Sequence, residues 1–416
     1  MKVLALILFL SLTLFALDIN EAMQRALQNS PSLKEKSLLT KVSHENTNIA
    51  YSSFKPNLDF SYGYSQFTHK QNFVSADSAS SADAVISYNL FNGFSDLYVL
   101  KASEEDEKVS HYAYEAAKAD LKLQVNLAYI NYLRSHKHIK VAQDTITLLE
   151  QQLHDAKNFF EQGLFAKNDY LQVDVELSSA KQALLAANKN VKVSFYRLKH
   201  LLGSELKEEE TLQELYKDAR NITAAVLKEK MLFNRSELKL LNAQTTALKY
   251  NYQAASTYSP TIDIQAKYQV AGVDPIPNGG ATFQTHDQTT ATVNLNWNIY
   301  RGGADEANRV SLLYQERASQ ERVKALHLEL EFQLEAAIQE YELSKNQIKV
   351  VTKALEQAEE NFRITKNQYK ENIANTSLML DAQRFLAQAQ VNYYTAYFAL
   401  YDAMGTLERV VEEKLF

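Results

Sequence analysis

Hydrophobic and polar residues alternate strictly between Thr289 and Tyr300, a pattern that predicts a β-strand with one apolar and one polar face. The two faces are Ala291, Val293, Leu295, Trp297 and Ile299 against Thr290, Thr292, Asn294, Asn296 and Asn298. Arg301-Gly302-Gly303 provides a flexible corner after the strand. Because neither Gly nor Pro follows until Gly405, we predict one helix from Ala304 to Glu371, on the order of 100 Å long.

The same strand, corner and helix occur once more in the first half of the chain. The segment from Asn89 to Asp96 aligns with the segment from Asn298 to Asp305 at an offset of 209 residues (298 minus 89). A second long helix, predicted from Ser95 to Gln162, contains neither Gly nor Pro. The sequence therefore predicts a tandem duplication.

Each long helix carries a regular stripe of apolar positions toward its C-terminal end. The spacing alternates between three and four residues in Ile139, Ala142, Ile146, Leu149, Leu153, Ala156 and Phe160, and again in Ile348, Val351, Leu355, Ala358, Phe362, Thr365 and Tyr369. Such a repeat predicts helices that pack knobs-into-holes along their length. Gly163 and Asn372 follow at equal positions, and both residue types tolerate the left-handed conformation that ends a helix. We therefore expect each long helix to turn back and form an antiparallel hairpin.

Shorter helices precede both pairs of strands. One is expected from Asp18 to Tyr51, ended by Pro56, and one from Ile222 to Thr257, ended by Pro260. Asn29-Ser30-Pro31 marks a local break in the first of them. Three further strands have apolar faces, formed by Leu58, Phe60, Tyr62 and Tyr64, by Ala84, Ile86, Tyr88 and Leu90, and by Ile262, Ile264, Ala266, Tyr268 and Val270.

Lys2 and the apolar run from Val3 to Phe15 are typical of a secretory signal peptide cleaved near Ala16. A retained membrane anchor is the alternative, although the run is shorter than the roughly 20 residues that a spanning helix needs. We assign residues 1–16 to the signal peptide, 17–203 to a first repeat, 204–221 to a linker and 222–416 to a second repeat. The mature protein is therefore expected to be exported.

Charge and composition narrow the function classes. The formal charge of -6 and the lack of a basic cluster argue against nucleic acid as a partner. The chain has no cysteine, which excludes disulfides, thiolate metal sites and a lipidated N-terminal cysteine. His136 and His138 do not share a helical face, so we predict no metal site, no cofactor and no catalytic residue. We therefore do not expect an enzyme.

The four strands have the length of tilted strands that cross a bilayer, and their apolar faces suit lipid. A four-stranded sheet has open edges, which the interior of a bilayer does not allow, so several copies must close a barrel together. Two copies would give a barrel filled by its own side chains, whereas three leave a lumen. We therefore expect a mainly α fold with a small β part: helical hairpins in a trimeric α-barrel, topped by a β-barrel of about 12 strands, four from each subunit.

Local motifs near the two turns resemble those of a known family. Phe160-Glu161-Gln162-Gly163 is followed by Asp169-Tyr170-Leu171, and the segment from Tyr369 to Asn372 is followed by Leu380-Asp381-Ala382-Gln383. These segments resemble the aromatic-x-x-Gly and Asp-Val-Leu-Asp-Ala patterns of the TolC family of outer-membrane efflux and secretion ducts, and the resemblance covers nearly the whole mature chain. Asn372 replaces the motif glycine and Leu378 stands where the family often has its first aspartate, which leaves the number of acidic rings open.

The resemblance implies a homotrimer in the outer membrane of a Gram-negative bacterium, with a helical tube across the periplasm. It also implies a periplasmic aperture closed by acidic and aromatic residues, here Asp381, Asp169 and Tyr369. In the family this aperture opens when a periplasmic adaptor (membrane fusion) protein and an inner-membrane pump dock at the helical tips. A carboxylate after a helix start also favours the helix dipole, and Tyr369 lies in an apolar stripe, so capping and packing are alternative roles.

Two further sets of residues follow from the same organisation. The adaptor-docking tips would be Gly163, Leu164, Phe165, Asn372, Ile373 and Ala374. The corners between helices and strands would be Gly93, Gly302, Gly303, Pro56 and Pro260.

The leading hypothesis is the exit duct of a tripartite efflux system that exports drugs, metals or similar small molecules. A duct for type I protein secretion is the alternative within the same fold, and the sequence does not separate the two. An exported coiled-coil structural protein is a third hypothesis, which follows from the apolar stripes alone and does not require strands suited to lipid.

Overall fold

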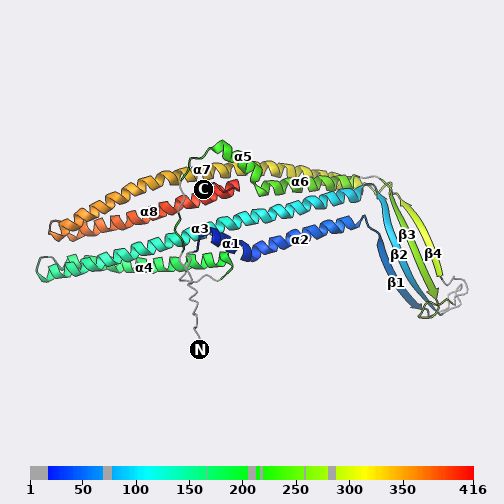
Figure 1. Cartoon of the computed structure of the whole chain (residues 1–416), viewed down its shortest axis with the longest axis horizontal. Coiled ribbons are helices and arrows are strands. Elements are labelled where there is room, and N and C mark those ends of the chain that lie inside the picture. Colours follow the sequence, from blue (N-terminus) through cyan, green and yellow to red (C-terminus); the bar gives the residue numbers. More distant parts are fainter. Residues whose placement is uncertain are drawn as a thin grey trace, which may run out of the picture. The chain divides into compact units, whose positions relative to one another are not determined.

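The chain folds mainly into helices, with one four-stranded antiparallel sheet (Figure 1), as predicted. The computed structural model describes residues 17–68, 77–164, 166–204, 212–215, 219–256, 259–279 and 287–416. The predicted signal peptide, most of the predicted linker and Phe165 lie outside these residues. Among the described helices, none contains an apolar stretch of the length that crossing a membrane requires.

Contacts in space between residues divide the chain into two compact units. The helical unit comprises residues 17–35, 115–236 and 327–416, and the strand unit comprises Lys36–Tyr114 and Glu237–Leu326. Each unit therefore combines residues from both halves of the sequence.

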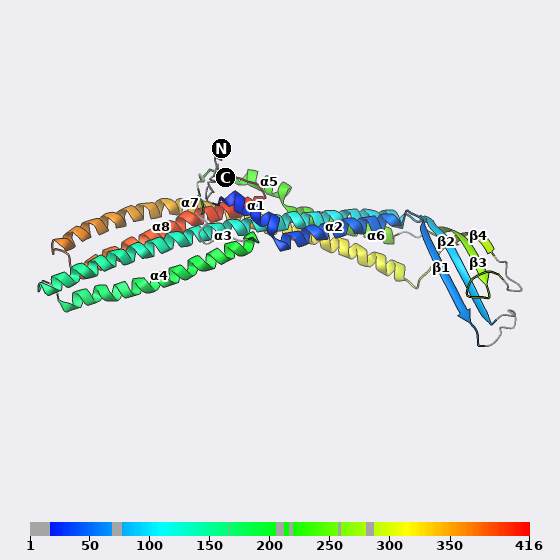
Figure 2. The same cartoon turned by 60° about the horizontal axis from the view of Figure 1, so that its bottom comes forward.

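Two long helices dominate the structure, and both follow the sequence prediction to within one residue. Helices α3 (Ser95–Glu161) and α7 (Ala304–Lys370) each contain 67 residues. The returning helices α4 (Lys167–Leu202) and α8 (Thr376–Val411) each contain 36 residues. Figure 1 and Figure 2 both show α4 beside α3 and α8 beside α7, so each pair forms the expected hairpin.

The shorter helices are broken in both halves. The predicted break in the first half is confirmed, because α1 (Ile19–Asn29) is followed by α2 (Pro31–Ser52). The second half was predicted to hold one helix, and that prediction is wrong: α5 (Ala224–Asn234) is separated from α6 (Ser236–Ala255) at Arg235. At this break the Arg235 guanidinium donates a hydrogen bond of 2.7 Å to the backbone carbonyl of Arg409, in a distant part of the chain.

The sheet contains β1 (Asn57–Gln66), β2 (Ser78–Asn92), β3 (Thr261–Gly272) and β4 (Asp287–Asn296) in this spatial order. The last strand is shorter than the predicted span of 289 to 300. Asn296 pairs with Thr261, and the residue before Thr261 is Pro260, which has no N–H group to extend the ladder.

The strand register confirms the predicted division of the sheet into two faces. Phe60 lies opposite Ala84, which in turn lies opposite Tyr268, so apolar residues of three strands share one face. On the other face, the Asn89 side-chain amide donates a hydrogen bond of 3.0 Å to the Asp263 carboxylate. One face of the sheet is therefore suited to lipid and the other to water.

The corners between strands and long helices use left-handed backbone. Gly93 has a φ of 58° and Phe94 a φ of 67° immediately before α3, while Gly302 and Gly303 have φ values of 62° and 85° before α7. At the same end of the sheet, Pro56 directly precedes β1 as Pro260 precedes β3.

Within the helical unit, α8 packs against α3, a helix from the other half of the chain. The two helices approach so closely that a Cβ atom on Gly405 would lie 2.0 Å from the Asn126 Nδ2 atom. Nearer the turns, the Gln383 side chain donates a hydrogen bond of 3.2 Å to the Thr145 carbonyl. Contacts at both ends of this antiparallel pair fix the position of α8 along α3.

An ion pair between Arg134 of α3 and Asp402 of α8 joins the same two helices, and the pKa of its carboxyl group is raised. Arg134 Nη1 lies 3.4 Å from Asp402 Oδ2, and the Asp402 side chain is 26% exposed. Burial raises the pKa of Asp402 to about 6, and Arg134 only partly offsets this effect. The carboxyl of the folded protein therefore holds its proton over a pH range in which the unfolded chain has lost it.

We expect the contribution of Asp402 to stability to fall as the pH rises from about 4 to about 6, because at this carboxyl the folded state binds more protons than the unfolded state in this window. A shift from 3.8 to about 6 corresponds to at most about 3 kcal/mol. The variant Asp402→Asn should lack this contribution. Melting temperatures of the two proteins at pH 4, 5, 6 and 7 test it, and parallel curves would contradict it.

Candidate aperture at the hairpin turns

The first turn ends α3 with a regular capping arrangement. Gly163 has a φ of 73°, which a glycine adopts without strain. Its N–H donates to the Phe160 carbonyl, and the Leu164 N–H donates to the Phe159 carbonyl, both at 2.9 Å. These two bonds form a Schellman motif, which satisfies carbonyls at the helix end.

The second turn repeats this geometry at the end of α7. Asn372 has a φ of 59°. Its N–H donates to the Tyr369 carbonyl at 3.1 Å, and the Ile373 N–H donates to the Gln368 carbonyl at 2.8 Å. The predicted left-handed conformation of Gly163 and Asn372 is therefore confirmed, and asparagine substitutes for glycine because it tolerates this region.

The tip residues differ in how much of their surface they expose. Leu164 is 56% exposed and Ile373 is 75% exposed, whereas Ala374 is buried. Gly163 and Asn372 are also exposed, and Phe165 lies outside the described residues. Each turn therefore presents one large aliphatic side chain to solvent in the isolated chain.

Tyr369 is a packing residue within this chain. Its side chain is buried, in a cluster with Ala374 and Met379. The Phe159 ring approaches it edge-on, at 6.3 Å between ring centroids and 75° between planes. Burial raises the pKa of the Tyr369 hydroxyl, so the group is neutral at physiological pH. Because Phe159 belongs to α3 and Tyr369 to α7, this contact joins the ends of the two hairpins.

The two acidic residues of the candidate site have different local roles. Asp169 lies in the first turn of α4, and its Oδ2 atom accepts a hydrogen bond of 2.9 Å from the N–H of Ala166. It therefore caps the helix, as one of the two interpretations expected. Asp381 does not cap α8, because Asn375 does so by accepting the Leu378 N–H at 2.9 Å.

The Asp381 carboxylate instead forms an ion pair with Arg384, one turn further along α8. Both side chains are largely exposed. Arg384 was missed in the sequence, although the spacing of three residues places the two side chains on the same helical face. The packing of Leu380 against Leu149 and Val173 of the first hairpin was also missed, because it depends on how the two hairpins meet.

The two histidines considered for metal binding occupy separate surroundings. The His136 ring packs edge-on against Tyr132, at 4.5 Å between centroids, while His138 Nε2 lies 3.4 Å from the Thr395 hydroxyl. Burial lowers the pKa of both imidazoles. Over the described ranges, no three His, Asp or Glu side chains gather in a way that could hold a metal ion.

Comparison with known proteins places this arrangement among outer-membrane channels. The family model described as outer membrane efflux protein matches residues 22–204 and 227–411. The outer membrane protein TolC of Vibrio cholerae serotype O1 is 22% identical over 421 residues, which cover 96% of this chain and 93% of that protein.

Two solved structures share the fold over nearly the full length. The CmeC outer membrane channel of Campylobacter jejuni has a TM-score of 0.86 at 15% identity, covering 95% of this chain and 86% of that one. A membrane protein from Pseudomonas aeruginosa has a TM-score of 0.83 at 16% identity, covering 94% and 93%. Because the family match includes most of both halves, the chain belongs to the TolC family of outer membrane efflux proteins, which are channels and not enzymes.

Proposed function

We propose that three copies of this chain assemble into an exit duct for small molecules, which crosses the outer membrane as a β-barrel and continues through the periplasm as a helical tube. The observation that carries this proposal is the four-stranded sheet, whose outer strands β1 and β4 each have one unpaired edge. Unpaired edges are not tolerated in lipid, so neighbouring copies must supply the missing strands. Three copies would give about 12 strands, enough to leave a lumen.

The two faces of the sheet support this orientation in the membrane. Phe60, Leu58 and Leu295 are exposed on the apolar face of the isolated chain, where a barrel would contact lipid. The opposite face carries Asp83 and Lys267, which form an ion pair of 3.0 Å between β2 and β3. Polar groups of this kind would line a water-filled lumen.

The hairpin turns support a docking role for the opposite end of the duct. Leu164 and Ile373 stand exposed on turns whose backbone bonds are satisfied. Large aliphatic side chains at two equivalent positions suit contact with a periplasmic adaptor protein. The adaptor would in turn connect the duct to an inner-membrane pump. The hairpin turns would also form the aperture, which would open when adaptor and pump dock.

Recording from planar bilayers tests the channel directly. The purified protein should produce discrete conductance steps, and it should run as a trimer in mild detergent. A monomer that leaves the bilayer silent would contradict the proposal and favour an exported coiled-coil protein. Deleting the gene then separates the substrate classes: greater sensitivity to toxic small molecules supports efflux, whereas loss of a secreted protein supports type I secretion.

Asp381→Ala is expected to raise the conductance severalfold, because removing a carboxylate and its pairing with Arg384 weakens the polar contacts at the aperture. Single-channel recording of wild type and variant measures this effect. Arg384→Ala is the matched variant: an equal rise would assign the closure to the ion pair, and no rise would assign it to the carboxylate alone. Unchanged conductance in Asp381→Ala would remove Asp381 from the aperture.

A further inference from the structure

The two breaks in the shorter helices have the same backbone conformation. Ser30, between α1 and α2, has φ and ψ values of -56° and 118°, and Arg235, between α5 and α6, has values of -56° and 113°. At both residues φ has a helical value, and only ψ lies outside the helical range. The same local geometry therefore occurs once in each half of the chain.

Only the first break is required by the local sequence. Ser30 precedes Pro31, and a proline disfavours the helical conformation of the residue before it and lacks an N–H group for the helical ladder. Arg235 precedes Ser236, which has an N–H group and imposes no such restriction. The segment from α5 to α6 contains neither Gly nor Pro that would force a break.

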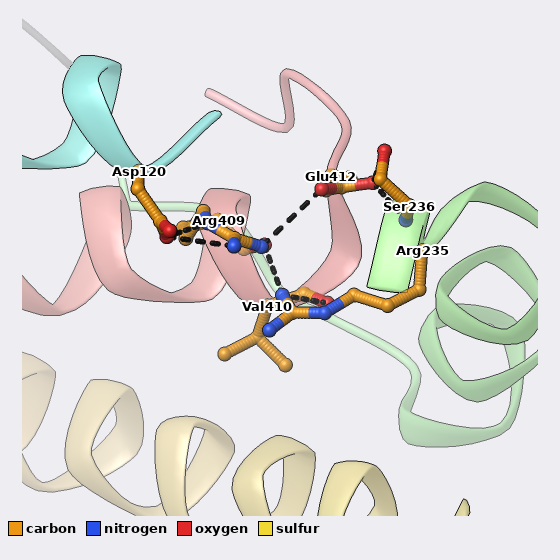
Figure 3. Close-up of polar contacts among 6 residues, drawn as sticks. All are labelled: Asp120, Arg235, Ser236, Arg409, Val410 and Glu412. Atoms are coloured by element: carbon orange, nitrogen blue, oxygen red, sulfur yellow. Dashed lines mark hydrogen bonds and ion pairs between the residues drawn. The ribbon is translucent and has the colours of Figure 1, made fainter. Parts of the chain in front are cut away.

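The second break is instead occupied by the C-terminal end of α8 (Figure 3). Glu412 Oε2 accepts hydrogen bonds from the Ser236 N–H at 2.7 Å and from the Ser236 hydroxyl at 2.9 Å. A carboxylate in this position caps the start of α6 in the way that an N-cap residue does from within a helix. Here the cap comes from the other end of the second half of the chain.

The contact works in both directions, because Arg235 caps the end of α8. Its Nη1 atom donates to the carbonyl of Arg409 at 2.7 Å, which also accepts the Glu412 N–H at 3.3 Å, and to the carbonyl of Val410 at 3.3 Å. Arg235 is buried, as is Ser236. Each helix end therefore supplies the groups that the other lacks.

The surrounding residues hold Glu412 in an uncommon conformation. Glu412 has a φ of 54°, the left-handed conformation that ends many helices but is uncommon for a residue other than glycine or asparagine, and its N–H donates to the Arg409 carbonyl at 3.3 Å. Arg409 Nη1 lies 3.3 Å from Glu412 Oε1, and Arg409 Nε donates to Asp120 of α3 at 2.7 Å. Asp120 thus fixes Arg409, and Arg409 positions Glu412 for the cap.

We propose that the break between α5 and α6 is conditional: it exists because Glu412 and Arg235 bind across it, and it closes into a continuous helix when the end of α8 withdraws. Glu412 and Arg235 are the positioning residues of this device. The break between α1 and α2, in contrast, is permanent because Pro31 encodes it. A shift of α8 along α3 is therefore coupled to the conformation at Arg235, whatever solute the channel carries.

A distance measurement across the junction tests this proposal. The chain has no cysteine, so spin labels can be attached in the full-length protein at Ala225→Cys and Lys249→Cys, two exposed positions. Labelled protein is diluted with unlabelled protein, so that only distances within one chain are observed. In a continuous helix the 24 residue steps from one label to the other correspond to about 36 Å along the helix axis.

Glu412→Ala should shift the measured distance to that of the continuous helix. Adding Ser236→Pro should restore the wild-type distance, because it places a proline where the first half has Pro31. Glu412→Gln keeps an acceptor oxygen and should retain the break. Glu413→Ala is the matched control: Glu413 binds Lys230 and Asn234 of α5 but does not touch Ser236, so the distance should not change.

Two results would overturn the proposal. An unchanged distance in Glu412→Ala would show that the break is intrinsic to the sequence from Asn234 to Ser236. In Glu412→Ala, a broad distribution of distances between the labels together with lower helicity would show that the end of α8 merely keeps two helix ends ordered. Neither result depends on conductance, so both are independent of the proposed channel function.

Discussion

Phe60→Arg is expected to destabilise the inserted barrel by about 2–4 kcal/mol, the cost of placing a cationic side chain on the lipid-facing surface of a transmembrane strand near the bilayer midplane. Phe60 lies within β1, away from both strand ends, and is 76% exposed in the isolated chain. In the proposed trimer this exposed surface would contact lipid. Urea unfolding of the protein in phospholipid vesicles measures the change in the free energy of unfolding.

The neighbouring residue provides the control. Ser61 is also exposed, and the alternation of the strand directs its side chain to the polar face. Ser61→Arg should therefore cost far less than Phe60→Arg, and Phe60→Leu should be close to wild type. Equal losses for the two arginine variants would show that the apolar face of the sheet does not contact lipid.

Arg409→Met is expected to cost about 3–5 kcal/mol, because it leaves the Glu412 carboxylate buried without its cationic partner. The side chains of Arg409 and Glu412 are 7% and 8% exposed. Methionine preserves most of the aliphatic length of arginine, so lost packing should contribute little. The free energy of unfolding in detergent, from urea titration, gives the size of the effect.

Two further variants identify the source of this loss. Arg409→Met combined with Glu412→Gln removes the unpaired charge and should recover most of the stability. Asp120→Asn breaks the outer part of the same network, and since Asp120 is 55% exposed it should cost no more than about 1 kcal/mol. If Arg409→Met were as mild as Asp120→Asn, the buried charge would not be the cause.

Local chemistry was sufficient to predict the long helices and the faces of the strands. The helices α3 and α7 could be bounded from the sequence because no Gly or Pro interrupts them and because Gly163 and Asn372 mark their ends. The alternation of Phe60 and Ser61 likewise predicted which side chains share a face. Such features depend on residues close together in the chain.

Most features that sequence reasoning missed depend on contacts between distant segments, whereas the Asp381–Arg384 ion pair is local and follows from a spacing of three residues. At the break between α5 and α6, Arg235 donates to a carbonyl 174 residues away, and no pattern around Arg235 reveals this contact. Packing was one of the two roles expected for Tyr369, but its partner Phe159 could not be identified, because their contact requires that the two hairpin ends meet. Asp169 is a partial exception, because its position after a helix start already suggested the capping role that the structure assigns.

Strands β2 and β3 come from different halves of the chain, yet they pair from Ser80 opposite Gly272 to Asn92 opposite Thr261. The halves are therefore joined within the sheet by ordinary antiparallel edge pairing, and this pairing does not require the peptide that connects them. A version of the protein produced as two polypeptides, divided between α4 and α5, would retain every strand neighbour of the intact sheet. Fragment complementation is thus a property that the topology itself allows.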